Sequence, residues 1–486
     1  MRLTRWKFRR TVQRVAGGLL SLALLAGLPA GCRPKEGPDG SSSLPIHSDS
    51  DAALSGPFLS PEEGASSEPP SYTSTDGPVV MSSPSQAAPP PEPAVSEPQV
   101  PDSSQDGSFK LDDLYPETRY YTPVSQEKKW FYRNLSESQR EIYRKISQAV
   151  IDMQSGKISL GACTYPDLAL AYTAVKSDHP EYFWMPSGYI YELTGGQMYV
   201  AFDYKQNGYQ MSYHYTKEER GYLVERLREV LTEAAAVLTP GMSEYQRELA
   251  LHDWLAARMT YDQNTAGGSK KHPAAFTVAS LVDGNAVCEG YSRAFQLLLY
   301  FAGVENTLAT GQIGKTGHMW NLVKVDGAWY HADATWNDSG DQGLHTYFNL
   351  TDAGIMADHT LDPDYTQLTY DDLMESKSFN LNLPACSSVF ASYFAQAGGL
   401  IAGEDAFAQT VADALAEAAI QGRRSAEFLF ADSYPVSFNS SFAMLQRLAK
   451  EKCVQLANAR LPADKQLPTS ISCNGVIGSR GFALSW

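Results

Sequence analysis

Three residues of this sequence have side chains that could together carry out nucleophilic catalysis. They are Cys288, His318 and Asp333. A thiolate attacks a carbonyl carbon, an imidazole carries the proton that the reaction moves, and a carboxylate orients the imidazole. The three residue types, in this order along the chain, therefore predict a Cys-His-Asp triad for acyl transfer, provided that the fold brings them into one pocket.

A tight turn supports a contact between the His and the Asp. Asp326-Gly327 has the composition of a type I′ hairpin turn between two strand-like runs. Counting back from this turn places His318 opposite Thr335, so that Asp333 becomes a diagonal neighbour on the same face. His331 lies on that face too and is the competing imidazole, farther from the end of the strand. A slip of one residue in the register would separate the pair.

Cys288 is predicted to begin a helix. Residues 288–302 have apolar side chains at helical spacing, and Gly303 ends the pattern. Asn285 is a candidate N-cap, and the N–H groups and dipole at this end of a helix favour a thiolate. Two alternatives stay open. One is an inert buried cysteine, and the other is a disulfide with Cys163, which would end the catalytic hypothesis.

The sequence around these residues resembles the transglutaminase-like superfamily, which has a papain-like cysteine fold. The resemblance covers about residues 249–337, and more loosely 131–358. It implies Cys288 as the nucleophile, His318 as general base and then acid, and Asp333 as the residue that orients His318. It rests on the helix that begins with Cys288 and on two runs, Gly317-His318-Met319-Trp320 and Gly327-Ala328-Trp329-Tyr330-His331-Ala332-Asp333-Ala334-Thr335-Trp336.

The same segment departs from the animal transglutaminases. Those enzymes have Trp after the Cys and use calcium, whereas here Glu289-Gly290-Tyr291 follows and no calcium-loop pattern occurs. The segment looks closer to bacterial exported members, many of which resemble hydrolases or have no assigned substrate. An oxyanion hole would use the backbone N–H of Cys288 and one upstream donor, for which Trp254 and Tyr261 are candidates. The resemblance therefore implies the fold more strongly than the reaction.

Composition and residue spacing argue against several other classes of protein. The chain has 39 Lys and Arg against 55 Asp and Glu, a net charge of -16 that makes nucleic acid a poor partner. It contains no C-x-x-C pair and no H-E-x-x-H run, so we expect no metal site and no cofactor. His252 and Asp253 are adjacent on a predicted helix and should point apart. For His345 and His359 the sequence predicts no partners.

The beginning of the chain is typical of an exported lipoprotein. Residues 1–31 carry six basic residues and no acidic one, followed by a short apolar run, which predicts a signal peptide whose removal would leave a net charge of -22. The run ends in Leu28-Pro29-Ala30-Gly31-Cys32, which resembles the bacterial lipobox. It predicts that Cys32 is lipidated and anchors the protein at the extracytoplasmic face of the membrane. An ordinary cleaved signal peptide is the alternative.

A long polar segment follows the predicted anchor. Of the 78 residues in 33–110, 39 are Pro, Ser or Gly. Such a segment has too few apolar side chains to offset the entropy lost on ordering. Residues 32–114 are therefore predicted to be a disordered tether that lets the folded part work away from the membrane.

The folded part is predicted to be an α+β protein with three regions. Residues 115–240 form an N-terminal α+β extension, and residues 241–368 form the transglutaminase-like core, with the Cys helix packed on an antiparallel sheet. Residues 369–486 form a small mixed α/β accessory region. Two capping boxes predict helix starts at Ser136 and Thr216, and Ser243 is predicted to cap a third helix.

These features predict a cell-surface cysteine enzyme that acts on amide bonds of a protein or peptide, with cell-wall peptide among the candidates. Attack by Cys288 would give a thioester that water or an amine resolves. Hydrolysis of the protease or amidase type is favoured over crosslinking, in keeping with the bacterial members. The alternative is a noncatalytic surface binding module on the same fold. A solute-binding lipoprotein would explain the anchor but not the Cys-His-Asp arrangement.

Overall fold

The structure is a computed structural model that describes most of the chain from residue 114 onward. The described residues are 114–115, 120–206, 209–268, 272–338, 345–361, 367–370, 377–380, 383–431, 449–468, 471–476 and 481–486. The predicted signal peptide, Cys32 and all but the last residue of the predicted tether lie outside them. Within these ranges no helix combines the length and the apolar character that a membrane span requires.

The N-terminal region combines helices with a small antiparallel sheet. Strand β3 (Gln197–Ala201) lies between β1 (Ile158–Gly161) and β2 (Ile190–Thr194). Strand β5 (Tyr209–Met211) pairs with β4 (Tyr204–Gln206). The helices of this region are α2 (Trp130–Arg133), α3 (Glu137–Ile151), α4 (Tyr165–Asp178) and α5 (Lys217–Ala235).

All three predicted helix starts are present, and each is a capping box. The side chains of Ser136, Thr216 and Ser243 each accept a hydrogen bond from a backbone N–H three residues later. They start α3, α5 and α6 (Glu244–Arg258). Because a capping box satisfies two N–H groups that a helix would leave unpaired, these three helix starts follow from local sequence alone.

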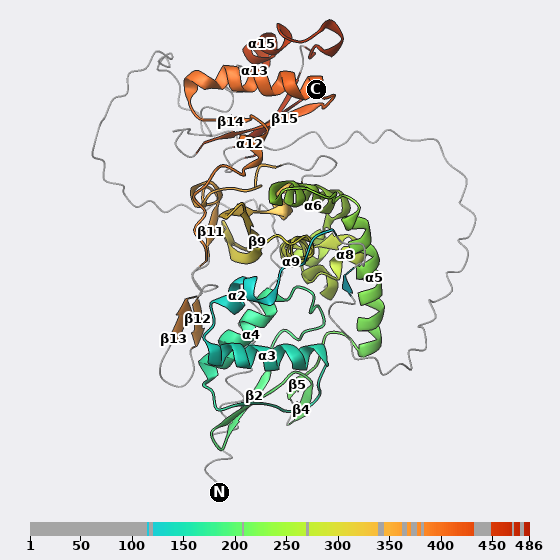
Figure 1. The fold of residues 1–486 in the computed structure, drawn as a ribbon, viewed down its shortest axis with the longest axis vertical. Coiled ribbons are helices and arrows are strands. Elements are labelled where there is room, and N and C mark those ends of the chain that lie inside the picture. The colour runs from blue at the N-terminus through green and yellow to red at the C-terminus, as the bar shows by residue number, and fades with distance from the viewer. Residues whose placement is uncertain are drawn as a thin grey trace, which may run out of the picture. The chain divides into compact units, whose positions relative to one another are not determined.

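The core consists of one antiparallel sheet and the helix that begins with Cys288. The helix, α9 (Cys288–Phe301), is buried on almost every side, and in Figure 1 it lies beside β9. Such all-round burial agrees with its apolar sequence. The sheet has the order β10-β9-β8-β11 and comprises β8 (Asn306–Ile313), β9 (Thr316–Val325), β10 (Ala328–Ala332) and β11 (His359–Leu361).

The turn between β9 and β10 has the predicted type, but the predicted ladder ends too early to pair His318 with Thr335. Asp326 and Gly327 have φ of 49° and 85°, as a type I′ turn requires. The register is as expected as far as Ala332, and it includes His331 opposite Leu322. The chain then leaves the sheet and begins the short helix α10 (Ala334–Asn337). The predicted pairing of His318 with Thr335 is therefore wrong.

One hydrophobic cluster joins the N-terminal region to the core. It contains Ile146, Trp184 and Leu231 from before the predicted boundary at residue 240, and Leu255 and Phe295 from after it. All five side chains are buried. The folded part has the predicted α+β composition, while the three domain boundaries stay predictions.

The C-terminal region is a small mixed α/β unit with its own hydrophobic cluster. An Ala-rich helix, α13 (Glu404–Ile420), lies across the sheet in Figure 1. A π-helical turn (Ala449–Cys453) and α15 (Val454–Asn458) come later in the region. The sheet comprises, in spatial order, β14 (Leu400–Ile401), β15 (Ser425–Phe430), β17 (Gly481–Ser485) and β16 (Ser472–Val476).

His345 connects the C-terminal sheet to the core. Its Nδ1 lies 2.9 Å from Oε1 of Glu427 on β15, and its Nε2 lies 2.8 Å from Oδ1 of Asp253 on α6. A carboxylate oxygen accepts but cannot donate, so both ring nitrogens carry protons and the ring is cationic. Burial alone would lower the pKa of His345, but the hydrogen bonds and charges of Asp253 and Glu427 outweigh it and raise that pKa to about 9. The ring also stacks on Tyr393, with 3.8 Å between centroids.

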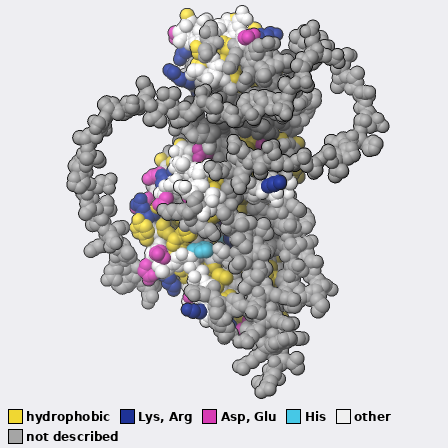
Figure 2. All heavy atoms as spheres, turned by 180° about the vertical axis from the view of Figure 1, so that it is seen from behind, with side chains coloured by type: hydrophobic (Ala, Val, Ile, Leu, Met, Phe, Trp, Pro, Cys, Tyr) yellow, Lys and Arg dark blue, Asp and Glu magenta, His cyan; other side chains and the backbone are white. Residues whose placement is uncertain are grey.

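Charges of both signs are scattered over the described surface. On the face drawn in Figure 2, acidic and basic side chains are intermixed. Several ion pairs join exposed groups, such as Arg144 and Glu137 at 2.8 Å. Exposed pairs of this kind contribute little to stability. The fold is therefore held mainly by its buried clusters.

Candidate active site

Cys288 is a buried thiol at the first position of α9. It is 5% exposed, and both it and Cys163 are free thiols, so no disulfide joins them. The residue before the helix is Val287, which offers no side-chain cap. The predicted cap by Asn285 is wrong, because Asn285 lies in the short strand β7 (Asn285–Ala286) and donates to the carbonyl of Asp283. The residue before Cys288 therefore provides no side-chain acceptor for the N–H groups of the first turn of α9.

A glycine one turn into α9 allows the helix to approach a neighbouring segment. A Cβ at Gly290 would lie 2.3 Å from the carbonyl oxygen of Ala275, in the short helix η3 (Pro273–Phe276). The same carbonyl accepts the N–H of Val287 at 3.0 Å. The start of α9 is therefore seated on η3, and only glycine allows that approach.

One serine hydroxyl connects the start of α9 to strand β9. The Oγ of Ser292 lies 2.8 Å from the carbonyl oxygen of Cys288 and 2.8 Å from that of Met319, the residue after His318. The carbonyl of Ser292 in turn accepts a hydrogen bond from Nδ2 of Asn321 on β9 at 3.0 Å. The structure thus fixes the turn that carries the thiol against the strand that carries the imidazole.

His318 and Asp333 are in direct contact. Nε2 of His318 lies 2.6 Å from Oδ2 of Asp333, and the two residues are only 4% and 0% exposed. Asp333 is the N-cap of α10, and its Oδ1 accepts the N–H groups of Thr335 and Trp336. The contact that the sequence analysis expected from a strand ladder is therefore made by a helix cap. That cap holds one carboxylate oxygen while the other faces the imidazole.

The carboxyl of Asp333 is strongly acidic in this setting. Burial alone would raise its pKa, but the charge of His318 and the hydrogen bonds of His318 and His359 outweigh it and hold the pKa well below its usual range. Asp333 is therefore ionised at neutral pH. An ionised carboxylate is the form that can orient an imidazole and stabilise its positive charge.

A second imidazole, that of His359, also contacts Asp333, although the sequence predicts no partner for it. Its Nε2 lies 3.2 Å from Oδ2 of Asp333, and its Nδ1 lies 2.6 Å from Oδ1 of Asp358. Burial acts to lower the pKa of His359, but the hydrogen bonds to these two carboxylates raise it above its ordinary value. The only local signal was an Asp-His pair in a segment without periodicity, and that pair does not reveal the fold around it.

His331, the competing imidazole, is occupied elsewhere. Its Nδ1 accepts the indole N–H of Trp320 at 2.9 Å, and its Nε2 donates to Oδ1 of Asp352 at 2.9 Å. Burial lowers the pKa of His331 despite the nearby carboxylate. The ring is therefore a neutral structural link with a fixed tautomer.

The described residues include three clusters with the side-chain types that metal ions use. In each cluster the possible ligand atoms lie within 4.8 Å of one another. Histidine nitrogens donate to carboxylate oxygens in every cluster, and a ring nitrogen must lose its proton before it can bind a metal. These hydrogen bonds explain why the side chains of each cluster lie close together. The clusters are His252 with Asp253 and His345, His318 with Asp333 and His359, and His331 with Asp352 and Cys386.

The first cluster corrects another expectation. Nδ1 of His252 lies 3.0 Å from Oδ1 of Asp253, although the two residues are adjacent on α6. The Nε2 of His252 faces Nδ2 of Asn337 at 3.0 Å, which assigns the ring proton to Nδ1. The predicted divergence of these two side chains is therefore wrong.

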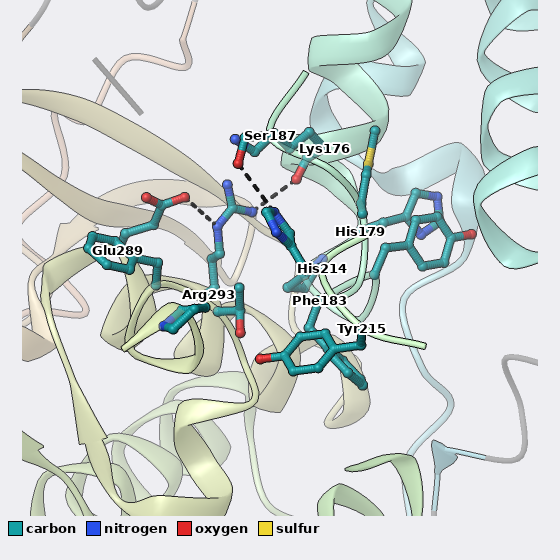
Figure 3. Close-up of a pocket in the computed structure, with 14 residues that line it drawn as sticks. Lys176, His179, Phe183, Ser187, His214, Tyr215, Glu289 and Arg293 are labelled. Carbon is teal, nitrogen blue, oxygen red and sulfur yellow. Dashed lines mark hydrogen bonds and ion pairs between the residues drawn. The ribbon is translucent and has the colours of Figure 1, made fainter. Parts of the chain in front are cut away.

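A cavity of about 220 Å³ lies beside the same end of α9 (Figure 3). Glu289 and Arg293 line it from α9, and Nε of Arg293 donates to Oε1 of Glu289 at 3.0 Å. The guanidinium also donates to the carbonyl of Lys176 at 2.9 Å. The opposite wall comes from the N-terminal region and includes Phe183, His214 and Tyr215. The cavity thus begins one residue beyond Cys288 and combines aromatic walls with an ion pair.

Part of the core matches a known protein family. Residues 232–334 match the model of the transglutaminase-like superfamily, and this range contains Cys288, His318 and Asp333. Residues 232–334 are transglutaminase-like. Members of this superfamily are generally cysteine enzymes.

Two solved structures match part of the chain. A crystal structure of a TGase is 15% identical, covers 32% of this chain and 46% of its own, and has a TM-score of 0.23. A candidate cysteine protease from Cytophaga hutchinsonii is 17% identical, covers 22% of this chain and 37% of its own, and has a TM-score of 0.18. The chain thus spans less than half of the length of either protein. No curated protein matches the chain at a significant level.

Proposed function

We propose that this protein is a cell-surface cysteine enzyme that cleaves amide bonds through Cys288, His318 and Asp333. The observation that carries the proposal is the 2.6 Å contact between the imidazole of His318 and the carboxylate of Asp333. His318 lies on β9, the strand to which Ser292 ties the start of the Cys288 helix. An oriented imidazole beside a helix-start cysteine is the arrangement that activates a thiol.

The proposed reaction proceeds through a thioester. Because Asp333 engages Nε2 of His318, Nδ1 is the nitrogen that takes the thiol proton of Cys288. The thiolate attacks the amide carbonyl carbon, and a tetrahedral intermediate forms whose oxyanion the N–H groups at the start of α9 stabilise. The C–N bond then breaks as His318 gives its proton to the leaving amine.

Water completes the cycle in this proposal. His318 removes a proton from water, and the hydroxide attacks the thioester carbon. The C–S bond breaks, sulfur recovers the proton from His318, and a carboxylic acid leaves. A primary amine in place of water would give a crosslink. We favour water, because the segment resembles exported bacterial members of the family more closely than the calcium-dependent transglutaminases.

A substrate screen tests the enzymatic proposal. Wild type, Cys288→Ala and the matched control Cys163→Ala would be incubated with a library of peptides, including cell-wall peptides, with and without a fluorescent primary amine. We expect new carboxylic acid products from wild type and Cys163→Ala and none from Cys288→Ala. Equal turnover by all three proteins would refute the nucleophile, and amine incorporation in place of acid formation would refute hydrolysis. An inactive wild type that still binds peptide would favour the noncatalytic binding module.

We also propose that the enzyme is exported and anchored through a lipid on Cys32. The proposal rests on the lipobox-like run and on the tether that follows it. Cys32→Ala should release the protein from the membrane fraction into the medium. A variant that stays in the membrane fraction would overturn the anchor.

A further inference from the structure

Strand β11 brings a second imidazole to the carboxylate of Asp333. β11 pairs with β8, and Gly311 on β8 stands opposite both His318 on β9 and Leu361 on β11. A Cβ at Gly311 would lie 1.9 Å from the carbonyl oxygen of Thr360. Glycine at this position therefore lets β11 join the sheet, and His359 reaches the site as the first residue of that strand.

Hydrogen-bond geometry fixes the charge of this second imidazole. Both ring nitrogens of His359 face carboxylate oxygens, that of Asp333 at 3.2 Å and that of Asp358 at 2.6 Å. The other oxygen of Asp358 accepts the phenol O–H of Tyr347 at 2.5 Å. An ionised carboxylate oxygen can only accept, so each nitrogen of His359 must donate. The ring is then an imidazolium.

The surroundings of His359 leave that charge little solvent. The residue is 2% exposed, and its ring lies between those of Trp320, Trp336 and Tyr347, with centroid distances of 5.2 to 5.5 Å. The ionisable groups that face it are Asp333 and Asp358, the imidazole of His318 at 5.4 Å between centroids, and, more remotely, the neutral imidazole of His331. The negative charges of Asp333 and Asp358 thus compensate the positive charge of His359. Of the neighbouring imidazoles, His318 is the one whose protonation this charge opposes most strongly.

We propose that His359 is a positioning residue that stays protonated on the catalytic carboxylate and sets the pH range over which His318 can exchange protons with Cys288. The inference rests on the proposed triad. His359 shares Oδ2 of Asp333 with His318 and so draws part of the negative charge away from His318. A catalytic imidazole must accept and release a proton near the working pH. If the carboxylate of Asp333 contacted His318 alone, it would raise the pKa of His318 further.

The size of the effect follows from distance. Two positive charges 5.4 Å apart repel each other by an amount that corresponds to about two pKa units at an effective dielectric constant of about 20. Replacing His359 by a neutral residue removes this repulsion. We therefore expect the pKa of His318 to rise by about one to two units in His359→Gln.

Titration by NMR tests the inference without any substrate. In a Cys288→Ala background His318 titrates without coupling to the thiol, and its ring nitrogen signals would be followed from acid to alkaline pH with and without His359→Gln. His331→Gln is the matched control, because His331 is also buried in this sheet but does not contact Asp333. An unchanged or lower pKa of His318 in His359→Gln, or an equal change in His331→Gln, would overturn the inference.

A second measurement serves if His359→Gln does not fold. The ring nitrogens of His359 itself should both carry protons at pH 7 in the otherwise intact protein. A neutral ring at that pH would contradict the inference. Failure of the proposed function would be recognised separately, because absence of turnover in the peptide screen leaves both titrations readable.

Discussion

Replacing His345 should change how the stability of this protein depends on pH. The imidazole lies between Asp253 and Glu427, its side chain is 11% exposed, and its pKa is about 9. In the unfolded chain the pKa of a histidine is about 6.5, so folding raises it by two to three units. At about 1.4 kcal/mol per unit, the charged ring contributes about 3 kcal/mol to the free energy of unfolding.

The sign follows from the direction of the shift. Because the folded state binds the proton more tightly than the unfolded state, the contribution is fully present below about pH 6.5. It decreases as the pH rises and is lost above the folded pKa of about 9. Alkaline conditions should therefore weaken the link between α6 and the C-terminal sheet.

Urea denaturation followed by tryptophan fluorescence would measure this effect. Wild type should lose about 3 kcal/mol more than His345→Gln between about pH 6 and pH 9.5, because the variant lacks the titrating group. His272→Gln, which removes an exposed imidazole, should behave as wild type. If wild type and His345→Gln lost stability in parallel over this range, the account of a cationic ring between two carboxylates would be wrong.

Three further predictions concern the core. Iodoacetamide at neutral pH should label Cys288 before the other four described cysteines. In three of those four, burial is the main cause of a raised thiol pKa. Mass spectrometry of tryptic peptides would show a different order of labelling if Cys288 were inert. Asp333→Asn should lower kcat/KM by about 10³-fold or more while the protein stays folded, and a loss below tenfold would remove Asp333 from the triad. Gly311→Ala should lower the free energy of unfolding by about 2 kcal/mol or more, because the added methyl group would clash with the carbonyl oxygen of Thr360. The control Gly221→Ala, on the open face of α5, should raise the free energy of unfolding by about 0.5 to 1 kcal/mol. Thermal denaturation of the two glycine variants would show equal shifts if the close approach at Gly311 did not matter.

Local patterns in the sequence were sufficient for the parts of the fold that depend on neighbouring residues. The capping boxes at Ser136, Thr216 and Ser243 start helices as predicted, because each involves residues only three positions apart. The type I′ turn at Asp326-Gly327 followed from residues that tolerate positive φ. Such features carry their own physical cause within a few residues.

The parts of the site that were not predicted depend on contacts between distant residues. The ladder argument led to His318 and Asp333, but the contact exists because Asp333 leaves the strand and caps α10. His359 lies 26 residues from Asp333, and His345 lies 82 residues from Glu427. No local periodicity encodes which of many acidic residues a histidine will meet, so these partners were visible only in the folded chain.

The segment 345–361 has a practical consequence for work with fragments. His345 near its start binds Glu427 of the C-terminal sheet, and His359 near its end binds Asp333. Leu429 of β15 is buried in the same cluster as Trp320 of β9. A recombinant protein truncated after residue 368 would keep Cys288, His318 and Asp333 but would expose that apolar patch to solvent. It would also leave the charged ring of His345 with Asp253 as its counter-ion, without Glu427. Expression and crystallisation trials should therefore treat the core and the C-terminal sheet as one piece.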